Sequence, residues 1–329
     1  MRNQLLIALL LGLVSAVVFA SATTGPVLFR YVLFLLTSLP IFLAGLGWGW
    51  RFAAVAGGAS ATFVGLLAGP LAGAIYALTQ IVPAIILSYL ALLNRAYKPE
   101  GSDAAVTEWY PVGRLVLWAA VMAGTITLLV LLIIGQDFEE LRAGLKTYLS
   151  EAIKTSMPES AGGAPLDEQQ LETMTNIVVA VMPAASAVSW LTALVFNLWL
   201  AGRITLAAGQ LQRPWPDISA MEFPPGTALM LLASMLGTGA KGIAGAVGTA
   251  FLGAFFLAYV FAGLAVIHYV TRGKSWRSLG LWMLYVGLLI VAVWIAVIIA
   301  LVGLAERPLR LRDRAFPSGP PPPPAPVAT

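Results

Sequence analysis

The stretch LVLWAAVMAGTITLLVLLII, residues 115–134, contains twenty consecutive residues without a charge. As an α-helix it is about 30 Å long, which is the thickness of the hydrocarbon core of a bilayer. Every backbone polar group in hydrocarbon must be hydrogen-bonded within the protein, so this run predicts a transmembrane helix. A membrane β-barrel is disfavoured, because its strands alternate apolar and polar residues over about ten positions.

The composition of the whole chain agrees with a membrane location. Of 329 residues, 59% are hydrophobic and 10% are charged, and the mean hydropathy is +0.88. Soluble domains carry about 25% charged residues. The net charge of +4 lies mostly in loops, where it signals topology rather than nucleic-acid binding. The chain has no cysteine, so we expect neither disulfides nor thiolate metal sites, and we expect no cofactor.

Similar apolar blocks recur and predict an all-α polytopic bundle of eight or nine spans. The first six predicted spans are residues 5–20, 27–46, 52–67, 71–93, 115–134 and 177–200. Pro40 should kink the second span, and Gly69-Pro70 should join the third and fourth in a tight hairpin. Residues 1–22 also resemble a cleavable signal peptide, but we expect a retained helix, because the rest of the chain already inserts.

A polar segment, residues 136–175, carries eight acidic residues and only three basic ones. Its first half has apolar residues at helical spacing and predicts an amphipathic helix that lies on the membrane surface or against other spans. A second helix should begin near Asp167 and continue into the sixth span. These observations divide the chain into a six-span core, residues 1–206, a second region, residues 207–306, and a tail, residues 307–329.

The second region is harder to divide. Residues 226–270 can form two spans separated near residues 237–242, but the first half is weak and could be re-entrant. The last span is predicted at residues 279–304. The tail begins basic and ends in Pro320–Pro324, which predicts a disordered polyproline II stretch.

The distribution of lysine and arginine predicts a cytoplasmic N-terminus and an acidic segment on the extracytoplasmic side of the membrane. Nine spans would then leave the basic residues 307–314 outside, against the usual rule. A re-entrant segment would return the tail to the cytoplasm but export Arg272, Lys274 and Arg277. Charge alone leaves this choice open, and we favour nine spans.

The predicted spans contain no aspartate or glutamate. Proton-coupled carriers usually keep such a residue in the membrane, so self-powered ion-coupled transport is disfavoured. A metalloprotease motif needs two histidines, and the chain has only His268. We therefore expect no enzyme. His268 itself is better explained as an interfacial side chain, Arg30 as a snorkelling one, and Lys241 as part of a glycine-rich turn.

Uncharged polar residues gather in the fourth and sixth spans. They could line a pocket for a small neutral solute, and the candidates are Tyr76, Gln80, Ser186, Trp190 and Asn197. The alternative is that they form hydrogen bonds between helices.

Small residues repeat every four positions in two spans, which allows close helix contacts. The candidate helix-docking residues are Ala8, Gly12, Ala16, Gly242, Ala246 and Ala250. Packing within the chain is one interpretation of these stripes, and docking of a partner membrane subunit is the other.

The order of the spans, with the motifs Gly263–His268 and Val302–Glu306, resembles the YybS-like family of bacterial inner-membrane proteins, which have a domain of unknown function. That family is distantly similar to the S components of energy-coupling-factor transporters. By this resemblance, Ala8, Gly12 and Ala16 would dock a transmembrane coupling subunit.

Two functional hypotheses follow. The first is a solute-binding subunit energised by partner ATPases, since the chain lacks a Gly-x-x-x-x-Gly-Lys-Ser/Thr loop of its own. The second is a non-transporting scaffold for membrane or envelope assembly, with the bilayer and other membrane proteins as its partners.

Overall fold

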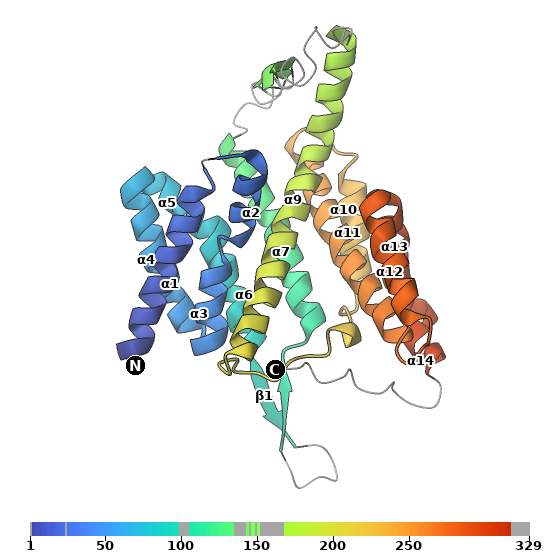
Figure 1. The fold of residues 1–329 in the computed structure, drawn as a ribbon. Helices are drawn as coiled ribbons and strands as arrows, with labels where there is room; N and C mark the ends of the chain where they lie inside the picture. The colour runs from blue at the N-terminus through green and yellow to red at the C-terminus, as the bar shows by residue number, and fades with distance from the viewer. Residues whose placement is uncertain are drawn as a thin grey trace. The chain divides into compact units, whose positions relative to one another are not determined.

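A computed structural model describes residues 2–23, 25–98, 105–134, 143–144, 146–148, 150–151 and 168–316. Within these residues, eight helices are long and apolar enough to cross a membrane (Figure 1). The all-α, polytopic prediction is therefore confirmed. Most of the acidic segment 136–175 and the proline-rich end of the tail lie outside the described residues.

The contacts between residues divide the chain into two units. Unit 1 comprises Met1–Met122, Leu191–Pro225 and Phe256–Thr329, and unit 2 comprises Ala123–Trp190 and Gly226–Phe255. Three helices continue from one unit into the other. They are α7 (Val112–Ile134), α9 (Glu168–Ala207) and α11 (Ile243–Val270).

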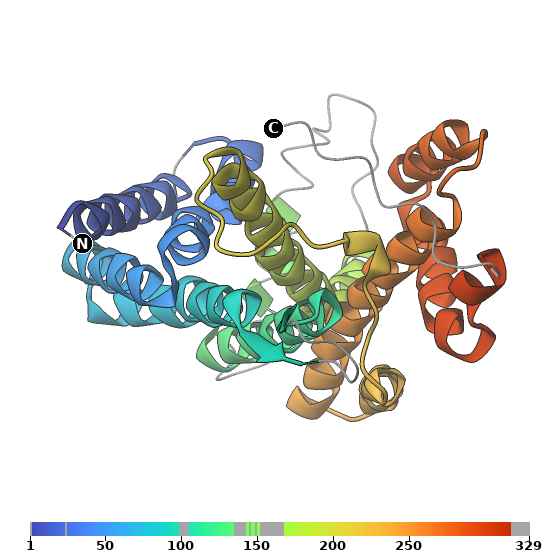
Figure 2. The ribbon, with the colours of Figure 1, turned by 90° about the horizontal axis from the view of Figure 1, so that it is seen from below.

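The first four predicted spans form the N-terminal part of unit 1. They are built from α1 (Arg2–Ser21), α2 (Val27–Leu36), α3 (Leu39–Trp48), α4 (Trp50–Ala68), α5 (Pro70–Tyr76) and α6 (Val82–Leu92). Helix α1 packs mainly on α4, and Figure 2 shows the two side by side. The expected hairpin at Gly69-Pro70 is present, and Gly69 makes it possible with a φ of 97° that favours glycine.

Prolines break two of these spans, as expected for the second. The helix ends at Leu36 and restarts at Leu39, because Pro40 cannot donate a backbone hydrogen bond. Ser15 satisfies the freed carbonyl of Thr37 at 2.6 Å. Before Pro83, the fourth span contains a π-helical turn, η1 (Ala77–Ile81).

A β-hairpin that the sequence did not suggest follows α6. Strands β1 (Asn94–Tyr97) and β2 (Val106–Trp109) pair antiparallel, with Arg95 opposite Glu108. An ion pair of 2.6 Å joins these two side chains. The hairpin extends beyond the end of α6 (Figure 1).

Helix α9 joins the predicted second helix of the polar segment to the sixth span. It has 40 residues and begins at Glu168, as the expected start near Asp167 requires. Its length of about 60 Å is twice that of the hydrocarbon core. After α9, residues 208–226 form a loop that contains a short 3-10 helix, η3 (Ile218–Ala220).

Unit 2 contains α10 (Thr227–Gly237), which packs against the first half of α11. The division near residues 237–242 is confirmed, and Lys241 lies exposed in the turn. Helix α10 has 11 residues, or about 16 Å, so it is too short to cross the bilayer alone. The weak seventh span is thus a short helix. Arg272, which follows α11, contacts Asp217, which precedes α10, so the basic loop is not exported as the re-entrant alternative required.

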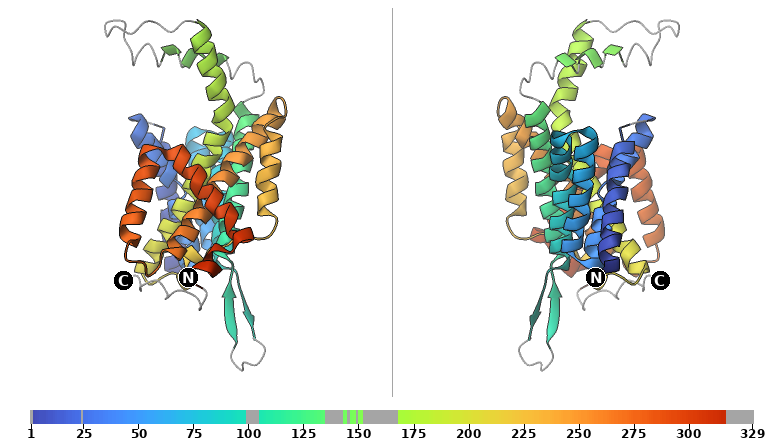
Figure 3. Two further views of the ribbon diagram at one scale, coloured as in Figure 1. Left: turned by 90° about the vertical axis from the view of Figure 1, so that its right-hand side faces the viewer. Right: turned by 90° about the vertical axis from the view of Figure 1, so that its left-hand side faces the viewer.

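The predicted single span at residues 279–304 is wrong. The helix breaks at Val291, which has a φ of −127° and a ψ of 48°, and two helices result. These are α12 (Arg277–Ile290) and α13 (Ala292–Leu309), which run antiparallel (Figure 3). A short helix, α14 (Leu311–Ala315), ends the described chain.

This hairpin also changes the topology argument. It brings residues 307–314 back to the same end of unit 1 as Arg272, Lys274 and Arg277. Contacts of Arg312 with Tyr269 and with residues 219–222 show that these segments meet there. The basic tail and the basic loop can therefore lie on the same side of the membrane. The sequence had offered only a basic tail outside or an exported basic loop. We call this the arginine-rich end of unit 1.

The two small-residue stripes lie largely inside the chain. Ala8 and Ala16 are fully buried, and a Cβ on Gly12 would lie 3.0 Å from the carbonyl carbon of Ala56 in α4. This face of α1 is therefore covered by α4, which follows the interpretation of packing within the chain, and docking of a partner subunit by these residues stays a prediction.

In the second stripe, Ala250 is buried and Ala246 is half-buried, but Gly242 is exposed in the turn before α11. Close packing in this region uses other glycines. A Cβ on Gly248 would lie 2.6 Å from the nitrogen of Thr238, and one on Gly253 would lie 2.6 Å from the oxygen of Ala184.

Candidate functional site: an apolar pocket with an arginine-rich lining

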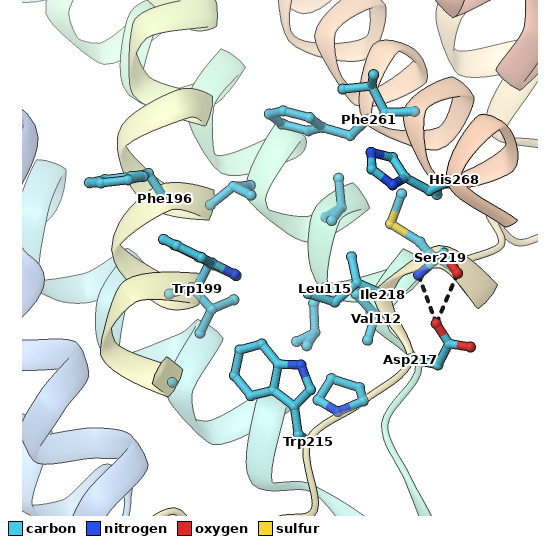
Figure 4. Close-up of a pocket in the computed structure, with 18 of the residues that line it drawn as sticks. Val112, Leu115, Phe196, Trp199, Trp215, Asp217, Ile218, Ser219, Phe261 and His268 are labelled. Atoms are coloured by element: carbon cyan, nitrogen blue, oxygen red, sulfur yellow. Dashed lines mark hydrogen bonds between the residues drawn. The ribbon is translucent and has the colours of Figure 1, made fainter. Parts of the chain in front are cut away.

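A pocket of about 960 Å³ lies at the arginine-rich end of unit 1 (Figure 4). All of its lining residues belong to this unit, although they come from distant parts of the sequence. The first turn of α7, the C-terminal part of α9, the loop after α9, the end of α11 and the start of α12 each contribute. The volume falls within the range of about 300–1,000 Å³ that is typical of small-molecule sites.

The body of the pocket is apolar and aromatic. Val112 and Leu115 of α7 contribute aliphatic side chains, and Phe261 of α11 contributes a ring. Phe196 and Trp199 of α9 line the pocket while remaining 42% and 44% exposed. Large aromatic rings that stay this accessible offer a contact surface to an apolar ligand.

A polar cluster at one edge of the pocket is centred on Asp217. Its carboxylate accepts hydrogen bonds from the backbone nitrogen of Ser219 at 3.1 Å and from the Ser219 hydroxyl at 2.9 Å (Figure 4). Arg272 donates to the same oxygen at 2.5 Å and also to the Ser219 hydroxyl. Burial raises the pKa of Asp217, but the hydrogen bonds and charge of Arg272, with the Ser219 bonds, outweigh it and hold the pKa below its ordinary value.

Arg213 lines another part of the pocket. One guanidinium nitrogen donates to the carbonyl of Ala91 at the end of α6, at 2.8 Å, and the group lies over the ring of Trp109 at 5.6 Å. Its Nε is buried without a hydrogen-bond partner. Burial lowers the pKa of Arg213, and no carboxylate within the described chain pairs with it to offset that effect.

The third arginine of the lining, Arg277, begins α12 and is half-buried. Its guanidinium has no hydrogen bond or ion pair with any described residue. Nearby in the lining, Nε2 of His268 and the hydroxyl of Tyr285 share a hydrogen bond of 2.7 Å that joins α11 to α12. His268 therefore has a structural partner, in keeping with its interpretation as an interfacial side chain.

Another buried arginine fixes the loop that carries Asp217. Arg312 of α14 donates to the carbonyls of Ser219 and Met221 at 3.1 and 2.9 Å. It also approaches the carboxylates of Glu222 and Glu306, at 3.4 and 3.6 Å. Arg312 and Arg272 both lie over the ring of Tyr269, at 5.4 and 5.2 Å, so α14 is tied to the edge of the pocket.

The five polar residues proposed from the sequence lie elsewhere, and none of them lines this pocket. The hydroxyl of Tyr76 bonds to Ser15 and Ser60 at 2.7 and 2.6 Å, which joins α5 to α1 and α4. Asn197 donates to the carbonyl of Leu35 at 2.5 Å, beside the break between α2 and α3.

Of the other three, Gln80 is buried in the π-helical turn with its Nε2 unpartnered. Ser186 accepts a hydrogen bond of 3.4 Å from Thr127 within unit 2. Trp190 is also buried in unit 2. The contacts of Tyr76, Asn197 and Ser186 follow the interhelical alternative, and a ligand role for the five residues stays a prediction.

Sequence reasoning missed the pocket because each lining group looks ordinary in its own segment. Arg213 stood in a proline-rich loop, and Arg277 stood in a basic connection that was interpreted as a topology signal. A usable signal was the loop Arg213–Asp217, in which two prolines and Trp215 lie between two charged residues. Only the fold brings this loop to the end of α11.

A family model described as "Predicted membrane protein (DUF2232)" matches residues 13–306 of the chain. No curated protein and no solved structure matches it.

Proposed function

The chain belongs to the "Predicted membrane protein (DUF2232)" family, the YybS-like family, and from this premise we propose that it binds an amphiphilic molecule in the pocket of unit 1. The observation that carries the proposal is the combination of a large apolar body with three arginines in the lining. An amphiphile fits this combination, because its apolar chain would cover the exposed rings while its polar end stayed among the charged groups.

The proposed location follows from the distribution of charge. We place the protein in the bacterial inner membrane, with the arginine-rich end of unit 1 in the cytoplasm, because cytoplasmic segments carry the excess of lysine and arginine. The pocket would then lie level with the head groups of the inner leaflet. A lipid or another membrane-soluble amphiphile could enter it sideways from the bilayer.

We assign the protein binding rather than catalysis. If the bound molecule is moved, the energy would come from partner proteins, since the sequence has no phosphate-binding loop of the Gly-x-x-x-x-Gly-Lys-Ser/Thr type. The scaffold hypothesis has one observation in its favour. The β-hairpin at the same end has exposed strands, which could pair with another protein.

The test is native mass spectrometry of the full chain purified in a neutral detergent. We expect an amphiphile that stays bound at a ratio of one per chain. Ala265→Phe places a ring in the pocket lining and should reduce that occupancy at least tenfold. Ala292→Phe introduces the same ring at an exposed position of α13 outside the pocket, and should retain the ligand.

Thermal unfolding of both variants shows whether they are folded. A wild-type protein that carries no amphiphile, or equal occupancy in a folded Ala265→Phe variant, would refute the proposal. A protein without a ligand that captures only envelope proteins through the hairpin would support the scaffold hypothesis instead.

A further inference from the structure

The charges in the pocket lining do not balance. Three arginines, Arg213, Arg272 and Arg277, stand against one carboxylate, that of Asp217. The ion pair of 2.5 Å between Arg272 and Asp217 accounts for one positive and the one negative charge. Two cationic side chains remain in a mainly apolar cavity without a carboxylate partner among the described residues.

Unpaired charge in an apolar cavity is costly, because desolvation disfavours the charged form and no opposite charge offsets it. For Arg213 the cost is visible in the structure. Its Nε is buried with no acceptor among the described residues, while another nitrogen of the group donates to the carbonyl of Ala91 and the guanidinium lies over the ring of Trp109. Arginine remains protonated in proteins, so these positions stay cationic and attract an anion.

The guanidinium group also restricts the kind of anion. Its planar donors match the geometry of oxyanions such as phosphate and carboxylate, and such charge-assisted hydrogen bonds are about twice as strong as neutral ones. We propose that the pocket is selective for amphiphiles with an oxyanion head group, recognised by Arg213 and Arg277. This inference rests on the proposed amphiphile binding and adds the charge and chemistry of the head group.

Arg272 has a different role. It donates to Asp217 and to the Ser219 hydroxyl and lies over Tyr269, so its guanidinium is already held by the protein. It orients the loop after α9 and is not assigned to the ligand. The selectivity for an anion therefore depends on the two arginines that have no acidic partner.

The experiment compares three probes on the purified full chain in a neutral detergent, by microscale thermophoresis. The probes are dodecyl phosphate, dodecanol and inorganic phosphate. We expect dodecyl phosphate to bind at least tenfold more tightly than dodecanol, and inorganic phosphate to bind far more weakly than either. Inorganic phosphate binding as tightly as dodecyl phosphate would overturn the amphiphile requirement.

The double variant Arg213→Gln/Arg277→Gln should lose at least tenfold in affinity for dodecyl phosphate and change by less than about twofold for dodecanol. Lys274→Gln is the matched control, since it removes one charge from the same connection as Arg277 at an exposed position outside the pocket. It should bind all three probes as the wild type does. If thermal unfolding shows that Arg213→Gln prevents folding, the single variant Arg277→Gln is compared with the wild type for the same loss of affinity for dodecyl phosphate.

The outcomes separate this inference from the function on which it rests. Equal binding of dodecyl phosphate and dodecanol, with no change in the arginine variants, would overturn the anion selectivity and leave amphiphile binding intact. If neither dodecyl compound binds, the proposed function itself fails.

Discussion

A Cβ atom on Gly303 of α13 would lie 2.7 Å from the backbone nitrogen of Gly263 in α11. The two helices therefore meet with their backbones in contact. A Cβ atom on Gly263 would in turn clash with the carbonyl of Ile299. The two motifs that suggested the family from the sequence, Gly263–His268 and Val302–Glu306, thus pack against each other. This contact holds α13 against the helix that supplies Phe261 and His268 to the pocket.

The first prediction concerns this contact. Gly263→Ala should lower the free energy of unfolding by about 1–3 kcal/mol, because the new methyl group forces the helices apart. Thermal unfolding in detergent measures the change. Gly58→Ala in α4 is the control, since no atom lies within 4 Å of the added methyl group and alanine favours the helix. Equal stability of the two variants would contradict the close contact.

The second prediction tests the buried hydroxyl of Tyr76. Tyr76→Phe removes the hydrogen bonds to Ser15 and Ser60 and should destabilise the protein by about 0.5–2 kcal/mol. Tyr89→Phe, at a side chain that is 44% exposed, should have little effect. A Tyr76 variant as stable as the wild type would indicate that these bonds contribute nothing.

The third prediction is a pH dependence. The pKa of Asp217 is lower in the folded protein than in the unfolded chain, so its ion pair stabilises the fold fully above the ordinary aspartate pKa of about 3.9. This stability is lost as the pH falls through the lower, folded pKa. Asp217→Asn should therefore be less stable than the wild type near neutral pH, and the difference should shrink below about pH 4. A difference that is constant with pH would show that the charge of Asp217 is unimportant.

The fourth prediction concerns Arg312. Arg312→Gln should free α14 from the loop after α9 and speed amide hydrogen exchange in residues 311–316, since the bonds to Ser219 and Met221 are lost. Arg314→Gln is the control, because Arg314 is exposed in the same short helix. Unchanged exchange in the Arg312 variant would show that α14 is held by other contacts.

The fifth prediction tests orientation and uses the absence of cysteine. Helix α11 has 28 residues, or about 42 Å, so Lys241 before it and Lys274 after it should lie on opposite sides of the membrane. In whole cells, a membrane-impermeant maleimide should label Lys241→Cys. It should label Lys274→Cys only after permeabilisation. The reverse pattern would invert the proposed topology, and labelling of both in intact cells would exclude a crossing.

The sequence was sufficient for the parts of the fold that depend on local physics. Apolar length located the first six spans, and Pro40 and Gly69 marked a break and a turn, because each constrains its own backbone. Val291 carried no such signal. No proline or glycine stands beside it, and a single span across residues 279–304 satisfies the same hydropathy as the observed hairpin.

The site was less predictable than the fold, for a physical reason. Polar residues inside spans, such as Tyr76 and Asn197, were proposed as site residues because a polar group in hydrocarbon costs free energy unless it has a hydrogen-bond partner. In the structure their hydrogen bonds serve helix packing, whereas the pocket is lined by charges at helix ends, where charge is ordinary. What makes Arg213 and Arg277 unusual is that neither has an acidic partner in the part of the chain that the structure describes, which becomes visible only in three dimensions.

The family match ends at Glu306, but the arginine that pairs with that glutamate is Arg312. The part of the chain shared with the family therefore stops six residues before one of its own buried contacts. A fragment cut at that boundary would keep the Glu306 carboxylate, whose side chain is only 17% exposed, and discard its counter-ion. The shortest fragment that keeps this contact ends at Arg312 in α14, so unit 1 extends beyond the end of the family match.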